Sequence, residues 1–248
     1  MSLKDLALRR LAADGDAFFA AAERDPAAPV RACPGWTVDK LVGHLGRIHT
    51  WAAQVVRSRT VEPVSPRLFP EGPDDPSLRL RWGQERHSEL LAALGELGEE
   101  EPIWVFLPSS HTGTGRFWLR RQALELALHR WDAQDATGEA EPPDAELAAE
   151  GIDELLTTFL PSMPGQTAQL GPDGASLHIH CTDREGEWLV RLSAEGPVVS
   201  GEHTKADVAV RGSAADLWLC LWNRVGRDRV EVFGDASLLD RWAEHVRI

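Results

Sequence analysis

The sequence of 248 residues contains no tyrosine, two methionines and only three cysteines. The cysteines, Cys33, Cys181 and Cys220, are spaced widely and irregularly, and no Cys-x-x-Cys pair occurs. This pattern argues against a zinc knuckle or a thioredoxin-like redox pair. Cys33 precedes Pro34 near the expected start of a helix, where the dipole would stabilise a thiolate, but a small buried residue at a turn is the favoured interpretation. We therefore expect any thiol used in catalysis to come from outside the protein.

Long hydrophobic runs are also absent. No apolar segment approaches the ~20 residues that cross a bilayer, so we expect no membrane span. The chain has 26 Lys and Arg and 39 Asp and Glu, so its formal net charge is 26 − 39 = −13. A surface with this negative charge repels nucleic acids and anionic membranes. Asp5, Asp14 and Asp16 interrupt the apolar residues near the N-terminus, so this segment indicates a first helix instead of a signal peptide. A cytoplasmic protein is expected.

The first part of the chain, residues 1–163, has helical apolar spacing. Thr37 is a natural N-cap, and Gly138 is a plausible C-cap for the helix that precedes it. A proline-rich connector at 61–76 cannot be helical throughout. The expected helices cover residues 3–23, the segment that follows Thr37, residues 77–97, the segment that ends near Gly138, and residues 144–160.

The second part, residues 164–248, changes to the two-residue alternation of strands. In SLHIHCTD, apolar residues alternate with His178 and His180. These histidines could chelate a metal from one strand face, but a solvated or cross-strand-paired polar face is the favoured interpretation. Strands are expected at 176–183, 187–194, 206–213 and 229–235, and helices at 213–225 and 236–246. The pattern predicts an α+β domain whose boundary lies near Pro164-Gly165.

The segment RRQALELALHRWD places Glu125 and His129 four residues apart, which stacks both side chains on one helix face. A carboxylate and an imidazole in this arrangement can hold a divalent metal, and His44 on the second helix could supply a third ligand. For the pair alone, a Glu–His hydrogen bond or a weak pair on the helix surface is the favoured interpretation. His44 and His49 border opposite edges of one apolar stripe, so periodicity does not choose between them.

Two segments, CPGWTVDKLVGHLGRIHTWAAQVV and RRQALELALHRWDAQDATG, resemble the signature segments of the mycothiol-dependent maleylpyruvate isomerase family. The segment ADVAVRGSAADLWLCLWNRVGRDRVEVFGD resembles that family's sterol-carrier-protein-like C-terminal domain. The resemblance implies a mainly α, DinB-like four-helix bundle over residues 1–163, followed by a smaller α+β domain over residues 164–248. It also implies a zinc enzyme that uses mycothiol as an isomerase or S-transferase.

By this resemblance, His44, Glu125 and His129 match the family's zinc ligands, and His49 does not. Members often carry histidine immediately before the glutamate, where this chain has Leu124. Because adjacent residues lie ~100° apart around a helix, Leu124 faces away from Glu125, and the change puts the substrate in doubt without altering the ligand set.

Three further residues are candidates for the site. Asp132, three residues after His129, could orient that histidine through its second ring nitrogen, although a helix-surface role is equally consistent. Trp36 could form a wall of the cofactor pocket or simply pack. Arg224 matches a recurring arginine of the family, and its guanidinium would suit a carboxylate of substrate or thiol across the domain interface.

Two other functions use the same residues. A hydrolase acting through zinc-bound water needs only the three metal ligands. A non-catalytic protein would bind an apolar small ligand in its α+β domain. Ser109, Ser110 and His111 lack the G-x-S-x-G context of a serine hydrolase. The partners we expect are a small-molecule thiol and an electrophilic substrate, with the protein a monomer or homodimer, and another divalent metal could replace zinc.

Overall fold

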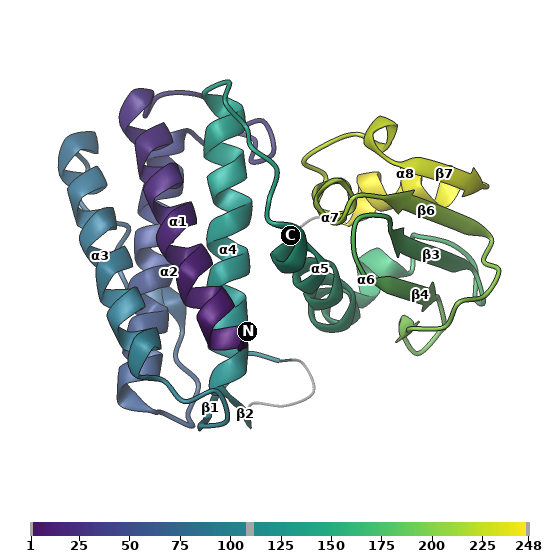
Figure 1. The fold of residues 1–248 in the computed structure, drawn as a ribbon, viewed down its shortest axis with the longest axis horizontal. Coiled ribbons are helices and arrows are strands. Elements are labelled where there is room, and N and C mark those ends of the chain that lie inside the picture. Colours follow the sequence, from purple (N-terminus) through teal and green to yellow (C-terminus); the bar gives the residue numbers. More distant parts are fainter. Residues whose placement is uncertain (1, 108–111, 247–248) are drawn as a thin grey trace. The chain divides into compact units, whose positions relative to one another are not determined.

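The computed structural model describes residues 2–107 and 112–246, and the chain separates into two compact units, Met1–Glu141 and Pro142–Ile248. In the first unit, four long helices lie side by side (Figure 1). They are α1 (Leu3–Arg24), α2 (Val38–Ser58), α3 (Pro76–Glu96) and α4 (Gly115–Ala136). The most extensive packing joins α1 to α4 and α2 to α3. The expected four-helix bundle is therefore confirmed.

The ends of these helices follow their capping residues. Ser2 and Asp5 form a reciprocal capping box at the start of α1, and the Thr37 side chain accepts a hydrogen bond from the Lys40 backbone at the start of α2. Asp75 caps α3. The connector before α3 contains a short 3₁₀ turn, Pro66–Leu68, so it is non-helical over most of its length as its prolines predict. A small hairpin that the sequence did not suggest, β1 (Pro102–Trp104) with β2 (Thr112–Thr114), precedes α4.

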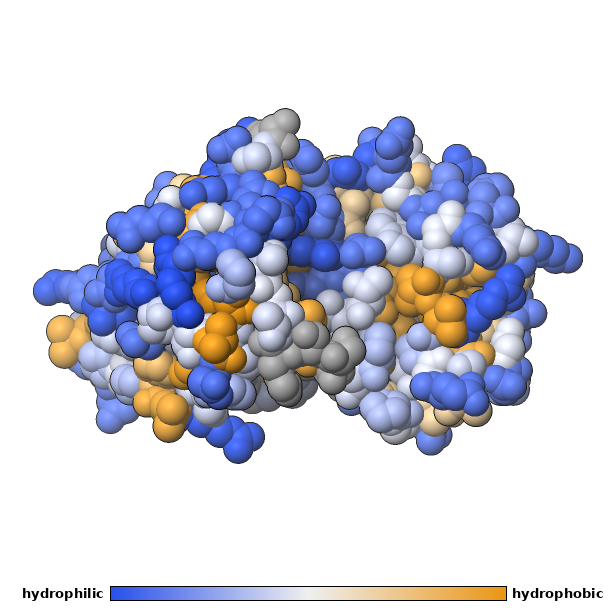
Figure 2. Space-filling model, turned by 90° about the horizontal axis from the view of Figure 1, so that it is seen from below, coloured by the Kyte–Doolittle hydropathy of each residue, from blue (hydrophilic) through white to orange (hydrophobic). Residues whose placement is uncertain are grey.

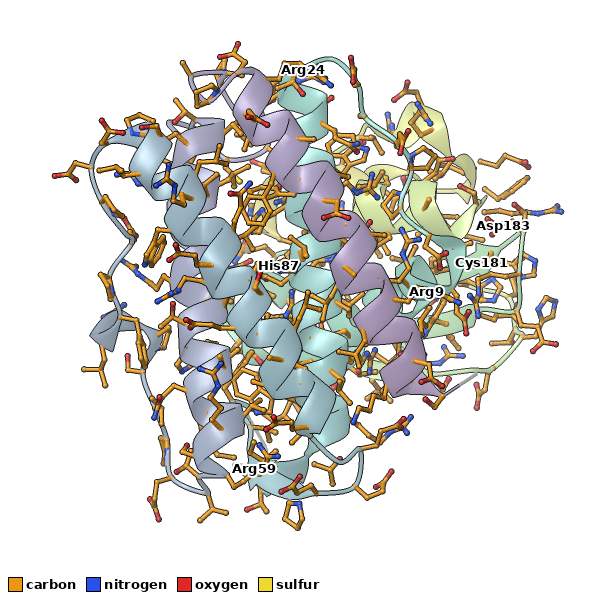
Figure 3. The ribbon with its side chains drawn as sticks, turned by 60° about the vertical axis from the view of Figure 1, so that its left-hand side comes forward. Arg9, Arg24, Arg59, His87, Cys181 and Asp183 are labelled. Carbon is orange, nitrogen blue, oxygen red and sulfur yellow. The ribbon has the colours of Figure 1, made fainter. Side chains whose placement is uncertain are left out.

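The core of the bundle is mainly apolar but also buries polar side chains, among them a pair of histidines. His49 on α2 is fully buried, and its ring centroid lies 5.2 Å from that of His87 on α3. His87 lies within the bundle (Figure 3) and packs against α1 at Gly15, where a Cβ atom would come within 2.3 Å of its Nε2. The buried apolar side chains of the bundle include Leu11, Phe18, Leu41, Leu45, Leu90, Leu94, Trp118 and Leu119.

The second unit combines a five-stranded sheet with helices. The strands are β3 (Ser176–Cys181), β4 (Glu187–Arg191), β5 (Val198–Ser200), β6 (Val208–Gly212) and β7 (Glu231–Gly234), in the spatial order β5-β4-β3-β6-β7. The β3–β6 pair is parallel, and the other three described pairs of this sheet are antiparallel. The helices are α5 (Ala145–Glu154), α6 (Pro164–Thr167), α7 (Ala214–Leu221) and α8 (Ser237–His245). The α+β class of this part is confirmed.

The structure differs from the sequence analysis at the domain boundary. The expected boundary lay near Pro164-Gly165, whereas the two compact units meet between Glu141 and Pro142. The helix expected at 144–160 is α5 followed by a π-helical turn at Leu155–Phe159, and α5 packs against α7. The contact is close because Gly151 has no side chain, and a Cβ atom there would lie 2.3 Å from the Trp218 ring. Helix α5 thus belongs to the core of the second unit.

None of the described helices is both long and apolar enough to span a membrane. Hydrophilic residues cover much of the face shown in Figure 2, with hydrophobic residues gathered in smaller patches. The large apolar side chains that are most exposed include Val61, Leu68, Leu78, Val198 and Phe233.

Candidate metal centre

A tight turn directly before α2 sets the start of the helix that carries His44. Gly35 adopts a φ of +82°, a left-handed conformation that glycine tolerates without strain. The Val30 backbone N–H donates to the Trp36 carbonyl, and Pro29 bridges Thr37 across the same turn. The turn brings the Trp36 ring edge-on to His44, with 5.3 Å between ring centroids. Trp36, for which the sequence left a pocket wall and simple packing open, lies directly beside a candidate metal ligand.

Glu125 and His129 project from one face of α4 toward His44. The Glu125 Oε1 atom lies 2.9 Å from His44 Nε2 and 3.6 Å from His129 Nε2. The two histidine rings meet edge-to-face at 5.1 Å. One ligand atom from each residue lies within 4.8 Å of the other two, close enough to surround a single ion. The structure thus brings together the three residues that the sequence singled out.

The two α4 ligands are each held by a neighbour on the same helix. Arg121 Nη2 donates to Glu125 Oε2 over 2.7 Å, which leaves Oε1 directed at the histidines. His129 Nδ1 donates to Asp132 Oδ2 over 2.9 Å, which leaves Nε2 as the atom that faces Glu125. Asp132 therefore occupies the orienting position suggested for it. Arg121 was missed, although its place one helical turn before Glu125 is visible in the sequence.

These neighbours set the protonation of the site. Burial alone would raise the pKa of Glu125, but the charge of Arg121 and hydrogen bonds from His129 and His44 outweigh it and hold that pKa well below its usual value. Burial alone would lower the pKa of His129, but Asp132 and Glu125 raise it to about 9. Without a cation, the pocket therefore holds a carboxylate against a protonated imidazole. The His44, Glu125 and His129 side chains are 24%, 20% and 12% exposed, so each keeps some contact with solvent.

Other singled-out residues lie elsewhere. His49, which periodicity could not distinguish from His44, is buried against His87, and neither of its ring nitrogens has a hydrogen-bond partner among the described residues. Leu124 is buried in the bundle. Arg224 belongs to the second unit, where its Nη1 donates to the Trp222 carbonyl and its guanidinium lies 5.7 Å from the Trp222 ring centroid.

Ser109, Ser110 and His111 lie outside the described residues. Cys33 is half-buried in the turn before α2, and its thiol is not in a disulfide. Arg130 follows His129 in the sequence. Its side chain donates hydrogen bonds to the Gln134 side chain and to the Glu141 carbonyl, and not to the three candidate ligands.

Comparison with known proteins places the chain in a family. Residues 8–134 match the model of the mycothiol maleylpyruvate isomerase N-terminal domain, and residues 146–241 match the model of the C-terminal domain of the same family. No curated protein sequence matches the chain.

Two solved structures share the fold over nearly the whole chain. One is a crystal structure of the mycothiol-dependent maleylpyruvate isomerase, with a TM-score of 0.60, and the other is a histidine-to-alanine mutant of that enzyme, with a TM-score of 0.66. In both cases 14% of residues are identical, and the alignment covers 94% of this chain and 93% of the other. Both domains thus match in order, and the chain belongs to the mycothiol-dependent maleylpyruvate isomerase family.

Proposed function

We propose that this protein is a metal-dependent enzyme in which His44, Glu125 and His129 hold a divalent cation, with zinc as the first candidate. The observation that carries the proposal is the convergence of three ligand atoms within 4.8 Å of one another. Two of the three ligands are also oriented from behind, Glu125 by Arg121 and His129 by Asp132. Such supporting hydrogen bonds are typical of metal sites.

The donor set fits a catalytic cation better than a structural one. Two imidazoles and one carboxylate leave a fourth coordination position of zinc for an exogenous ligand, and a net positive charge remains. When bound, the cation would supply the charge that keeps a thiol ionised near pH 7. The protein contributes the ligand geometry, the ionised Glu125 that Arg121 maintains, and solvent access beside Trp36.

The thiol would be mycothiol, as the family suggests, and two of the three cysteines of this chain, Cys181 and Cys220, are unsuited to the role. The pKa of Cys181 and that of Cys220 are each raised to about 11 by burial, so both remain protonated at neutral pH. The mycothiol thiolate would add to an electron-poor double bond, as in maleylpyruvate. Rotation about the new single bond, followed by elimination of the thiolate, gives an isomerase; protonation of the enolate by water and release of the adduct gives an S-transferase.

Arg224 would bind a carboxylate of the substrate or of the thiol. The guanidinium provides paired N–H donors that match a carboxylate. Arg224→Ala should then raise the Michaelis constant for the acidic substrate more than it lowers kcat, and unchanged kinetics would remove this role.

The test of the proposal is the metal content of untagged protein, measured by elemental mass spectrometry. His44→Ala, Glu125→Gln and His129→Ala should each contain about one metal equivalent less than the wild type, with unchanged circular dichroism, and should lose thiol-dependent turnover of unsaturated acids. His245→Ala, a histidine of the second unit outside this site, is the matched control and should change neither quantity.

Each alternative outcome has a distinct meaning. Full metal content in all three variants would contradict the ligand assignment. Turnover without added thiol would favour a hydrolase that uses metal-bound water. Tight binding of small acyl or lipid-like ligands by a protein that takes up no metal would favour a non-catalytic binding protein.

A further inference from the structure

A second group of potential ligands lies on the sheet of the second unit. Glu187, the first residue of β4, pairs in register with His180 on β3. His178 lies two residues earlier on β3 and therefore on the same face of the strand. His203 reaches this face from the segment 201–207 that joins β5 to β6. Three histidines from two separate segments thus surround one carboxylate.

The distances are those of a ligand cluster. Glu187 Oε1 lies 2.9 Å from His178 Nε2 and 3.3 Å from His180 Nδ1, and it accepts a short hydrogen bond from His203 Nδ1. One ligand atom each from His178, Glu187 and His203 lies within 4.8 Å of the other two.

His178 supplies an independent observation. Its residue surface is 8% exposed, and its Nε2 has no hydrogen-bond partner among the described residues, although it lies 2.9 Å from the Glu187 carboxylate. The approach is short enough for an ion pair, but its direction does not suit a hydrogen bond. A buried ring nitrogen left in this state is costly. A cation placed between Nε2 and Oε1 would satisfy both atoms.

The cluster also has an open side. His178 and His203 line a cavity of about 700 Å³, together with Thr204, Lys205 and Phe233. An ion held by the cluster would therefore keep access to water or to a small anionic ligand, which the Lys205 ammonium would favour.

We infer that His178, Glu187 and His203 form a second metal site, for a divalent transition-metal ion of the zinc class, with His180 beside it. Imidazole nitrogens select zinc, copper or nickel over magnesium and calcium, which prefer oxygen ligands. A bound ion would connect segment 201–207 to strands β3 and β4. This site lies in the second unit and does not depend on the function proposed for His44, Glu125 and His129.

The inference is tested by titrating zinc alone into the untagged full-length chain. In a His44→Ala background, where the first site is removed, the protein should still bind about one zinc per chain in competition with a chromophoric chelator. Adding His203→Ala should abolish this binding. Because the His203 side chain is 79% exposed, its removal should not affect folding. Glu187→Gln should also abolish binding, and His245→Ala should leave it unchanged.

Hydrogen exchange provides a second readout. Zinc should slow amide exchange in residues 201–207 of His44→Ala protein and should have no such effect once His203→Ala is added. The inference is overturned if His44→Ala protein binds no zinc, or if binding survives both His203→Ala and Glu187→Gln. If His44, Glu125 and His129 bind no metal, the result is different. Wild-type and His44→Ala proteins would then bind equal amounts of zinc, and His203→Ala would reduce the amount bound.

Discussion

His129 donates from Nδ1 to Asp132 Oδ2 over 2.9 Å, so the histidine presents Nε2 to Glu125 and His44. Asp132 is fully buried, and its carboxylate therefore acts on His129 with little screening by water. The hydrogen bond fixes the tautomer that a metal ligand requires and increases the basicity of the ring.

The first prediction concerns this carboxylate. Asp132→Asn keeps the shape but removes the charge and should weaken zinc binding about tenfold, whereas Asp132→Ala should weaken it up to about 100-fold. The affinity is measured by chelator competition in a His203→Ala background, so that only the site between α2 and α4 is followed. Asp135→Asn, which changes a carboxylate of the same helix that pairs with Arg31, is the control. Equal affinities for Asp132→Asn and Asp135→Asn would show that Asp132 does not support the metal.

The second prediction concerns Arg121. In metal-free protein, Arg121→Gln should raise the pKa of Glu125, because the positive charge that counters the burial of this carboxylate is lost. The shift can be followed at the Glu125 side-chain carboxyl carbon by NMR as a function of pH. Arg116→Gln, which removes a charge paired with Glu99 at the start of α4, should leave the Glu125 titration unchanged. An unaltered Glu125 pKa in Arg121→Gln would contradict the assigned role.

The sequence predicted the pairing of Glu125 with His129 because helix periodicity alone places residues i and i+4 on one face. It could not choose between His44 and His49, since both border the same stripe of α2 and the choice depends on which helices pack against each edge. The structure shows His49 directed toward His87 on α3 and His44 directed toward α4. The family resemblance favours His44 because its position matches a family zinc ligand, which is information that helix periodicity does not carry.

Other features depended on contacts between distant segments. Gly151 in α5 gave no sign that the Trp218 ring would occupy the space beside it. The alternation of β3 predicted a polar face at His178 and His180; His180 pairs across the sheet with Glu187, but His178 is buried like its apolar neighbour Ile179. The convergence of His203 on Glu187 could not be predicted, because it requires a connecting segment to return across the sheet.

The third prediction concerns acid stability. Burial lowers the pKa of His49 well below its usual value, with the neighbouring His87 adding to the effect, and burial also lowers the pKa of His87. Below about pH 6.5 these histidines become protonated in the unfolded chain and stay neutral in the fold, so stability falls with decreasing pH. Replacing one of them should reduce this slope by up to about 1.4 kcal/mol per pH unit.

The measurement is the free energy of opening of α2 amides by hydrogen exchange, compared at pH 7 and pH 5.5 after correction for intrinsic rates. His49→Leu should flatten the pH dependence relative to the wild type. His245→Leu, in the second unit, should not. If His49→Leu retained the full acid loss of the wild type, the buried pair would not be its cause.

The last prediction uses two helical glycines that differ in their surroundings. Gly15 of α1 has the His87 ring against it, and a Cβ atom would lie 2.3 Å from Nε2, whereas a Cβ atom on Gly95, near the end of α3, would point into open space. Gly15→Ala should destabilise the bundle by about 1–3 kcal/mol, because the packed ring cannot move away freely. Gly95→Ala should stabilise it by up to about 1 kcal/mol, since alanine favours the helix. Urea unfolding of the two variants measures the sign of each change in the free energy of unfolding. A Gly15→Ala protein as stable as Gly95→Ala would mean that His87 does not pack against α1 as described.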